Sequence, residues 1–113
     1  MIDLQKQKLN NSFGLKETDL EEIISVLSQQ PEVKEAFIFG SRAKGNFKKG
    51  SDVDIALKGE KLNLQITSHI SLLLNEETTM PYRFDLLNYH TISNKELTDH
   101  VNRLGVLFYK KNE

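Results

Sequence analysis

Two acidic residues that could take part in catalysis or bind a metal lie within residues 40–57, which read GSRAKGNFKKGSDVDIAL. Asp52 and Asp54 stand two residues apart in an apolar segment, and strand side chains at that spacing project from one face. Two carboxylates about 5 Å apart repel by roughly 3 kcal/mol at an effective dielectric near 20. Oxygen-only ligands favour Mg²⁺ or Mn²⁺ over zinc. The alternative is that one aspartate is solvated at the strand end while the other caps a loop, and for an isolated pair that alternative is the better interpretation.

A third acidic residue, Asp85, changes the balance. It lies in the middle of YRFDLL, residues 82–87, where an unpaired carboxylate is costly because both flanking residues are apolar. If this strand neighbours that of Asp52 and Asp54, three carboxylates converge. The third can complete a metal's shell and accept a proton from an attacking hydroxyl, as two-metal phosphoryl transfer requires. An ion pair between Asp85 and Arg83 is equally well supported by these residues alone.

The Gly-Ser pair at the start of the same stretch is suited to an anion. Gly40 lets the backbone approach a ligand closely, and Ser41 offers a hydroxyl and an amide at a possible helix N-terminus, where phosphate is favoured. Cationic side chains follow the pair at Arg42, Lys44, Lys48 and Lys49. The alternative is an ordinary solvated turn. Together, an anion cradle and three carboxylates indicate one ligand that carries phosphates and metal ions.

Periodicity and turn residues predict the elements that position these groups. A capping box at Thr18 and Glu21 starts a helix that should end near Pro31. A strand follows over residues 33–39, and then a loop with room for a helical turn after Ser41. A second strand is expected over residues 52–57.

The second half of the chain repeats the alternation. A helix is predicted over residues 62–76 and a third strand over 82–87. A second capping box, at Ser93 and Glu96, starts a helix that stops at Gly105, before an edge strand over 106–109. The predicted order is α-β-β-α-β-α-β. The fold class is α/β in the wide sense that includes α+β: a small mixed sheet with helices packed on it.

Length and charge narrow the classes of function. The 113 residues predict a single domain over 1–113, with residues 1–13 loosely held. The net charge of -1 provides no global field for nucleic acid or an anionic membrane, so phosphate affinity must be local. The chain has no cysteine, which excludes disulfides and thiolate metal sites. No signal peptide or membrane span is evident, and we expect a cytoplasmic protein.

Residues 40–57 resemble the signature of the DNA polymerase β-type nucleotidyltransferase superfamily. There, Gly-Ser follows the first strand and an Asp-x-Asp strand comes about ten residues later. The motif sequence is most similar to that of the minimal nucleotidyltransferases, whose motif commonly runs GSRARG and then SDIDL. Lys44 stands where arginine is frequent in that family and keeps the positive charge. The ending HVNRLGVLFYK, residues 100–110, also resembles the helix-Gly-strand finish of those proteins. The resemblance spans most of residues 18–110.

The resemblance implies a nucleotidyltransferase fold and a two-metal site. Gly40 and Ser41 would hold the terminal phosphates of the nucleotide, while two Mg²⁺ ions (or Mn²⁺) would bind the acidic residues. Asp85 would also help to deprotonate the acceptor hydroxyl, which attacks the α-phosphate of ATP and releases pyrophosphate. The implied nucleotide contacts are Gly40, Ser41, Arg42 and Lys44. The implied metal ligands and catalytic residues are Asp52, Asp54 and Asp85.

The resemblance also implies a partner. Minimal members are often encoded beside a helical HEPN protein and act as the antitoxin of that pair, and some attach AMP to a tyrosine of the HEPN ribonuclease toxin. Larger members carry an acceptor-binding domain, for which we expect no room here. The leading hypothesis is therefore a Mg²⁺-dependent protein adenylyltransferase. Its oligomeric state, a homodimer or a hetero-oligomer, is left open.

Three other functions remain as alternatives. One is a non-catalytic antitoxin or adaptor that binds a helical partner, although a pure binder has no need for repelling carboxylates. Another is a small-molecule transferase of the aminoglycoside type. An RNA 3′-end transferase is a weaker alternative, because the chain has no excess of basic residues that could follow a phosphate backbone. Stable nucleic-acid binding is therefore not expected.

Three residues near the motif are left open or placed outside the site. Phe47, at a loop tip among lysines, fits either contact with a base or partner or folding back onto the sheet. His90 follows the third strand and could approach the site. His100 is expected on the solvent side of the last helix.

Overall fold

The computed structural model describes residues 13–112 and confirms the predicted order of elements, with a short helix after the first strand. The elements are α2 (Glu17–Ser28), β1 (Glu35–Phe39), α3 (Gly40–Lys44), β2 (Val53–Lys58), α4 (Leu64–Glu76), β3 (Phe84–Asn88), the 3-10 turn η1 (Tyr89–Thr91), α5 (Lys95–Leu104) and β4 (Val106–Lys110).

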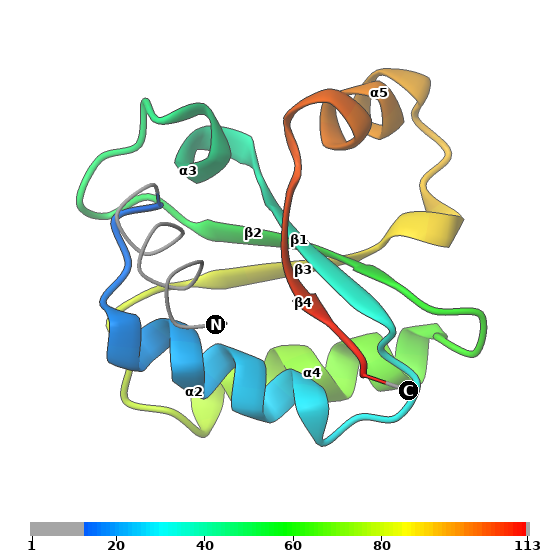
Figure 1. Ribbon diagram of the computed structural model, residues 1–113, viewed down its shortest axis with the longest axis horizontal. Helices are drawn as coiled ribbons and strands as arrows, with labels where there is room; N and C mark the ends of the chain where they lie inside the picture. The colour runs from blue at the N-terminus through cyan, green and yellow to red at the C-terminus, as the bar shows by residue number, and fades with distance from the viewer. Residues whose placement is uncertain (1–12, 113) are drawn as a thin grey trace.

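The strands form one mixed sheet in the order β3-β2-β1-β4. β1 pairs antiparallel with both β2 and β4, whereas β2 and β3 run parallel. Helices α2 and α4 cover one face, and α3 and α5 lie on the other (Figure 1). The expected mixed sheet with helices packed on it is confirmed. β4 is an edge strand, as predicted, and β3 forms the opposite edge.

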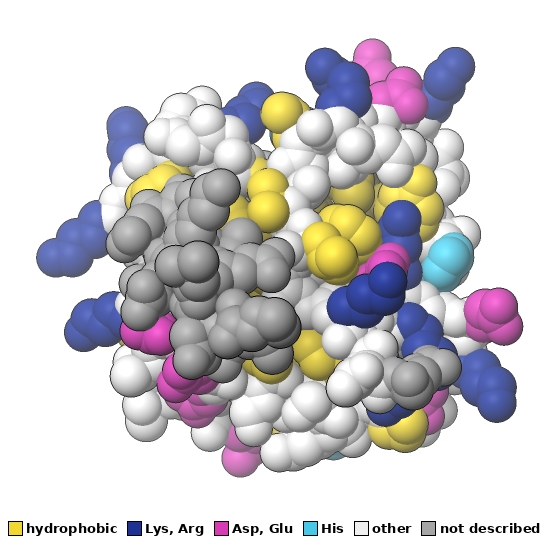
Figure 2. Space-filling model, viewed as in Figure 1, with side chains coloured by type: hydrophobic (Ala, Val, Ile, Leu, Met, Phe, Trp, Pro, Cys, Tyr) yellow, Lys and Arg dark blue, Asp and Glu magenta, His cyan; other side chains and the backbone are white. Residues whose placement is uncertain are grey.

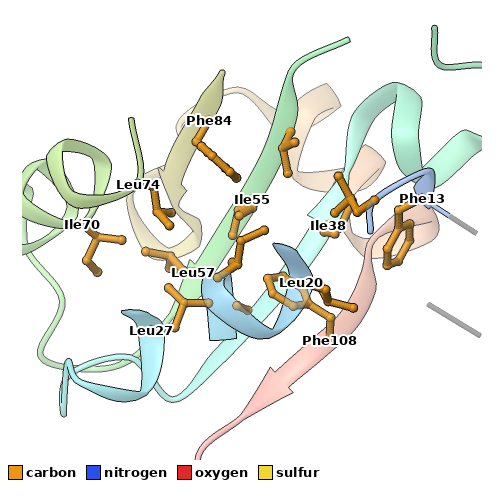
Figure 3. Packing of buried hydrophobic residues seen from close by; sticks show 14 of the residues in the cluster. Phe13, Leu20, Leu27, Ile38, Ile55, Leu57, Ile70, Leu74, Phe84 and Phe108 are labelled. Atoms are coloured by element: carbon orange, nitrogen blue, oxygen red, sulfur yellow. The ribbon is translucent and has the colours of Figure 1, made fainter. Parts of the chain in front are cut away.

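The main hydrophobic core lies between the sheet and the helices α2 and α4 (Figure 3). It includes Leu20, Ile23, Leu27, Ile38, Ile55, Leu57, Ile70 and Leu74, each at most 1% exposed. A smaller cluster of Phe39, Ala56 and Val101 joins α5 to the other face. Because strand side chains alternate, Val53 and Ile55 enter the main core and Asp54 projects from the opposite face, as the sequence predicts.

Both predicted capping boxes are wrong by one or two residues. α2 begins at Glu17 after Lys16, which makes no side-chain cap, so Thr18 already lies inside the helix. α5 is capped by Asn94, whose side chain accepts a hydrogen bond from the Leu97 amide. At α5 the neighbouring Ser93 and Asn94 both suit a cap position, and the spacing rule alone does not choose between them.

The start of the described chain is anchored. Phe13 is 1% exposed and belongs to the main core, so the expectation of a loosely held segment is wrong for this residue. The rest of that expectation, residues 1–12, lies outside the described residues.

Charged side chains of both signs are mixed over the surface. On the face drawn in Figure 2, Lys and Arg are scattered among Asp and Glu without forming one basic field. Among residues 13–112, no helix has the length and apolar character needed to span a membrane.

Candidate active site

Three groups singled out from the sequence lie in a row across the sheet. β1 is antiparallel to β2, which pairs Phe39, the residue before Gly40, with Asp54. β2 is parallel to β3, which pairs Asp54 with Asp85. Neighbouring strands lie about 4.8 Å apart, so about 10 Å of sheet separates the Gly40 end of β1 from Asp85. The geometric condition set by the sequence, that the Asp85 strand neighbours the Asp54 strand, is met.

Asp54 is the electrostatic centre of this row. Its pKa is raised to about 6, first by burial and then by the negative charges of Asp85 and Asp52. Asp52 and Asp85 therefore both lie close enough to Asp54 to act on its carboxylate. The part of this rise in pKa that comes from the two neighbouring carboxylates is one that a nearby cation would offset.

Gly40 presses directly against the Asp54 carboxylate. Its φ of +74° lies in the left-handed region, and a Cβ added to it would collide with Asp54 Oδ2. The absence of a side chain therefore lets the turn after β1 reach the carboxylate. A glycine is needed at this position for both reasons, the backbone conformation and the close approach.

The other two aspartates are exposed, and within residues 13–112 no ion pair joins Asp85 to Arg83. Over residues 13–112, no three Asp, Glu or His side chains stand close enough together to enclose a metal ion. Asp52 and Asp85 are thus adjacent to Asp54 without converging on one point. Their exposure leaves their rotamers free to turn toward a shared cation.

The donor set nonetheless fits hard cations. The charged groups that act on Asp54 are the carboxylates of Asp85 and Asp52, and carboxylate oxygens suit Mg²⁺ or Mn²⁺ and not a thiolate-bound metal. The repulsion from Asp85 and Asp52, which adds to the effect of burial on the pKa of Asp54, would be relieved by such an ion. Among residues 13–112, Asp52, Asp54 and Asp85 are the carboxylates that could hold such an ion.

Arg42 requires a correction. It was expected to contact a triphosphate, but it is 2% exposed and its guanidinium is used by the protein itself. It donates to the carbonyl of Phe13 at 2.7 Å and to that of Ser51 at 2.9 Å. The rings of Phe47 and Tyr82 flank it at 5.1 and 5.3 Å. Arg42 therefore ties the segment before α2 to the loop that leads into Asp52, and is a positioning residue.

We expect Arg42→Lys to lower the free energy of unfolding by about 2 kcal/mol, because a lysine cannot keep both charged hydrogen bonds in the same fork. Urea unfolding measures the change. Lys44→Ala is the matched control, since this cation of the same helix is exposed, and it should stay within about 0.5 kcal/mol of wild type. An Arg42→Lys protein as stable as wild type would contradict the role given to the guanidinium.

The remaining residues near the motif are also located. Lys44 is exposed at the end of α3 and stays available for an anion, while Ser41 is partly exposed beside Gly40. Phe47 folds back onto the protein, but its contacts are with Arg42 of α3 and with Gly14 before α2, and not with the sheet as the second alternative had it. His90 accepts a hydrogen bond from the Gly59 amide at 3.3 Å, past the far end of β2, and does not approach the carboxylates.

His100 was missed by the sequence reasoning. Its Nε2 accepts a hydrogen bond from the Gly40 amide at 3.1 Å, and its ring packs edge-on against Phe39. The side chain is half-buried, so the expectation of a solvent-facing position is wrong. No local signal could have placed it there, because 60 residues separate it from Gly40.

A family model described as Polymerase beta, Nucleotidyltransferase matches residues 21–113. No curated protein sequence matches the chain.

Solved structures share the fold. A toxin-antitoxin with AMP-PNP has a TM-score of 0.66 at 19% identity, covering 86% of this chain and 75% of the other. A complex of tri-AMPylated Shewanella oneidensis HEPN toxin with MNT antitoxin has a TM-score of 0.63 at 19% identity, covering 83% and 71%. A putative nucleotidyltransferase from Sulfolobus solfataricus has a TM-score of 0.55 at 22% identity, covering 98% and 89%.

Proposed function

Because the chain belongs to the polymerase beta nucleotidyltransferase family, we propose that it transfers AMP from ATP to a protein hydroxyl. The acceptor we propose is a tyrosine of a HEPN toxin, which makes this chain the antitoxin. The observation that carries the proposal is the row in which Asp85, Asp54 and the Gly40 turn stand side by side. Solved complexes of similar fold, one with AMP-PNP and one with an AMPylated HEPN toxin, support it.

The residues take separate roles in the proposed reaction. Gly40 and Ser41 bind the terminal phosphates, with Lys44 within reach of their charge. Mg²⁺, or Mn²⁺ in its place, held by Asp52, Asp54 and Asp85, would supply neutralisation of the triphosphate when bound. The role of Arg42 is to hold the loop before Asp52, as described above.

The bond changes balance without any further reactant. The acceptor oxygen forms a bond to the α-phosphorus, the bond from that phosphorus to the β-phosphate oxygen breaks, and pyrophosphate leaves. Asp85 accepts the hydroxyl proton, for which its exposed carboxylate on the edge strand is accessible. Positioning and charge stabilisation supply most of the catalysis in such phosphoryl transfers.

In the proposed binding mode the Gly40 amide donates a hydrogen bond to a phosphate oxygen. The hydrogen bond that this amide now donates to His100 must therefore break. A net hydrogen bond is worth about 0.5–1.5 kcal/mol, so we expect His100→Ala to bind MgATP roughly 2- to 10-fold more tightly. Calorimetric titration measures the affinity. His69→Ala, at an exposed histidine on α4, is the control and should not change it. Weaker binding by His100→Ala would show that the imidazole supports the phosphate site instead of competing with it.

The direct test of the proposed function uses the HEPN-domain protein encoded beside this chain. We expect incubation with ATP and Mg²⁺ to add AMP to a tyrosine of that protein, seen as a mass increase and located by peptide mapping. Chelation of Mg²⁺ by EDTA should prevent the addition. If no adduct forms and the chain binds no nucleotide, the proposed function is wrong.

A further inference from the structure

Asp85 lies on a strand that has a neighbouring strand on one side only. β3 forms an edge of the sheet and pairs with β2 alone. Within residues 13–112, no hydrogen bond or ion pair holds the Asp85 carboxylate. The place of this carboxylate is therefore set by the backbone of β3. An edge strand opens more readily than a strand paired on both sides, because fewer contacts hold it.

The side chain of Asn75, on α4, takes the place of the missing neighbour. On the side of β3 that faces β2, the Val53 amide donates to the Arg83 carbonyl at 2.8 Å. Backbone groups alternate in direction along a strand, so those of the next residue, Phe84, point to the open side. There the side-chain oxygen of Asn75 accepts from the Phe84 amide at 2.8 Å, and its nitrogen donates to the Phe84 carbonyl at 2.9 Å. Both backbone groups of the residue before Asp85 are thereby bonded.

The orientation of the Asn75 amide is fixed by its partners. A backbone amide only donates and a backbone carbonyl only accepts, so the oxygen of Asn75 faces the one and its nitrogen the other. The nitrogen also donates to the hydroxyl oxygen of Ser71, one turn earlier on α4, at 3.1 Å. Phe84 is 3% exposed, so breaking these bonds would leave buried polar groups unsatisfied. The Asn75 side chain is thus held in one position between α4 and β3.

From this geometry we infer that Asn75 is a positioning residue for Asp85: it holds the backbone of β3 so that the Asp85 carboxylate stays beside Asp54. The pairing of β2 with β3 places these two aspartates opposite each other, and the Asn75 bonds hold β3 from its open side. The inference rests on the proposed function, because the role of Asp85 in transfer is taken from it. It adds a residue outside the sequence motif, on a helix, on which the rate of transfer depends.

Asn75→Ala is expected to lower kcat for AMP transfer to the HEPN protein about 10- to 30-fold, because a small displacement of a reacting group is costly. The KM for ATP should stay within about 3-fold of wild type, since the phosphate-binding turn at Gly40 lies at the other end of the row. Transfer kinetics measured by mass spectrometry give both values.

Asn63→Ala is the matched control on the same helix. The Asn63 side chain caps α4 by accepting a hydrogen bond from the Ile66 amide at 2.9 Å, so its removal weakens α4 without removing a bond to β3. We expect this variant to have a lower urea midpoint than wild type and a kcat within about 2-fold of it. A loss of activity that came only from a less stable α4 would be as large in this variant as in Asn75→Ala.

A double variant shows whether Asn75 acts through Asp85. If it does, adding Asn75→Ala to Asp85→Asn should lower the remaining rate by less than about 2-fold, because the carboxylate that is positioned is already gone. A general loss of structure would instead multiply the two separate losses. An Asp85→Asn chain as active as wild type would refute the role of Asp85, and this inference with it.

Amide hydrogen exchange gives a readout that does not depend on activity. We expect Asn75→Ala to speed the exchange of the Phe84 amide at least about 10-fold, while the amides of the central strand β1 change by less than about 3-fold. Asn75→Gln, whose extra methylene group breaks the two-bond geometry, should behave in the same way and replaces the alanine variant if that variant does not fold. A Phe84 amide that exchanges as in wild type would overturn the inference.

The outcomes separate the two proposals. Wild-type transfer together with a fully active Asn75 variant, with equal losses in the Asn75 and Asn63 variants, or with multiplied losses in the double variant refutes the positioning role and leaves the proposed function standing. A wild-type chain that neither binds MgATP nor transfers AMP refutes the proposed function, and the inference about Asn75 with it.

Discussion

An Asp54→Asn variant is expected to transfer AMP at least about 1,000-fold more slowly than wild type, and at pH 7 to be more stable. The activity falls because Asp54, the proposed metal ligand at the centre of the row, lies next to both Asp85 and the Gly40 turn. Losing several kcal/mol of charge stabilisation in the transition state corresponds to this factor. Transfer to the HEPN protein, followed by mass spectrometry, measures it.

The gain in stability follows from the raised pKa of Asp54. In the folded chain this pKa is about 6, against an ordinary aspartate value of 3.8, so the folded state binds the proton more tightly. Stability present below pH 3.8 is therefore lost as pH rises through 6. The full shift corresponds to about 3 kcal/mol, and partial solvation of the carboxylate reduces the expected penalty to about 1–2 kcal/mol. The asparagine variant avoids this penalty.

Urea unfolding at pH 4.5 and pH 7 measures the stability difference, which should be larger at pH 7. Asp99→Asn serves as the control, because Asp99 is exposed on α5 away from the three carboxylates, and should change neither activity nor stability. A less stable Asp54→Asn protein at pH 7 would contradict the electrostatic account. If this variant still neutralises the toxin fully, the alternative of an antitoxin that acts by binding is supported over catalysis.

The local part of the site could be predicted from the sequence because strand periodicity is a short-range property. The alternation that sends Val53 and Ile55 into the core necessarily turns Asp54 outward. The prediction that Asp85 belongs to the same site depends on β3 lying beside β2. No feature within either strand decides the order of the strands in the sheet. The parallel pairing in the structure supplied that information.

Other features depend on contacts between distant segments, which no spacing rule encodes. The guanidinium of Arg42 is satisfied by the carbonyls of Phe13 and Ser51, and a carbonyl is available at every position of the chain. The GSR sequence predicts a triphosphate contact for Arg42, but tertiary contacts occupy its guanidinium instead. The same applies to His100, which meets Gly40 only because α5 packs over α3.

Gly40→Ala is expected to reduce AMP transfer about 100-fold and to lower the free energy of unfolding by about 1–3 kcal/mol. Two effects combine: the left-handed φ strains any residue with a Cβ, and the new methyl group collides with Asp54 Oδ2. The carboxylate can relieve the collision only by moving from its place between Gly40 and Asp85. Transfer kinetics and urea unfolding of the same protein measure both effects.

Two other glycines of the motif loop separate backbone strain from collision. Gly45 also has a positive φ, +89°, but a Cβ there would meet no atom within 4 Å. Gly45→Ala should therefore lose about 1–2 kcal/mol of stability and keep its activity. Gly50→Ala meets no atom and has no positive φ, so it should be close to wild type in both measurements. If Gly45→Ala loses as much activity as Gly40→Ala, strain in the loop explains the effect, and the contact between Gly40 and Asp54 has no special part in it.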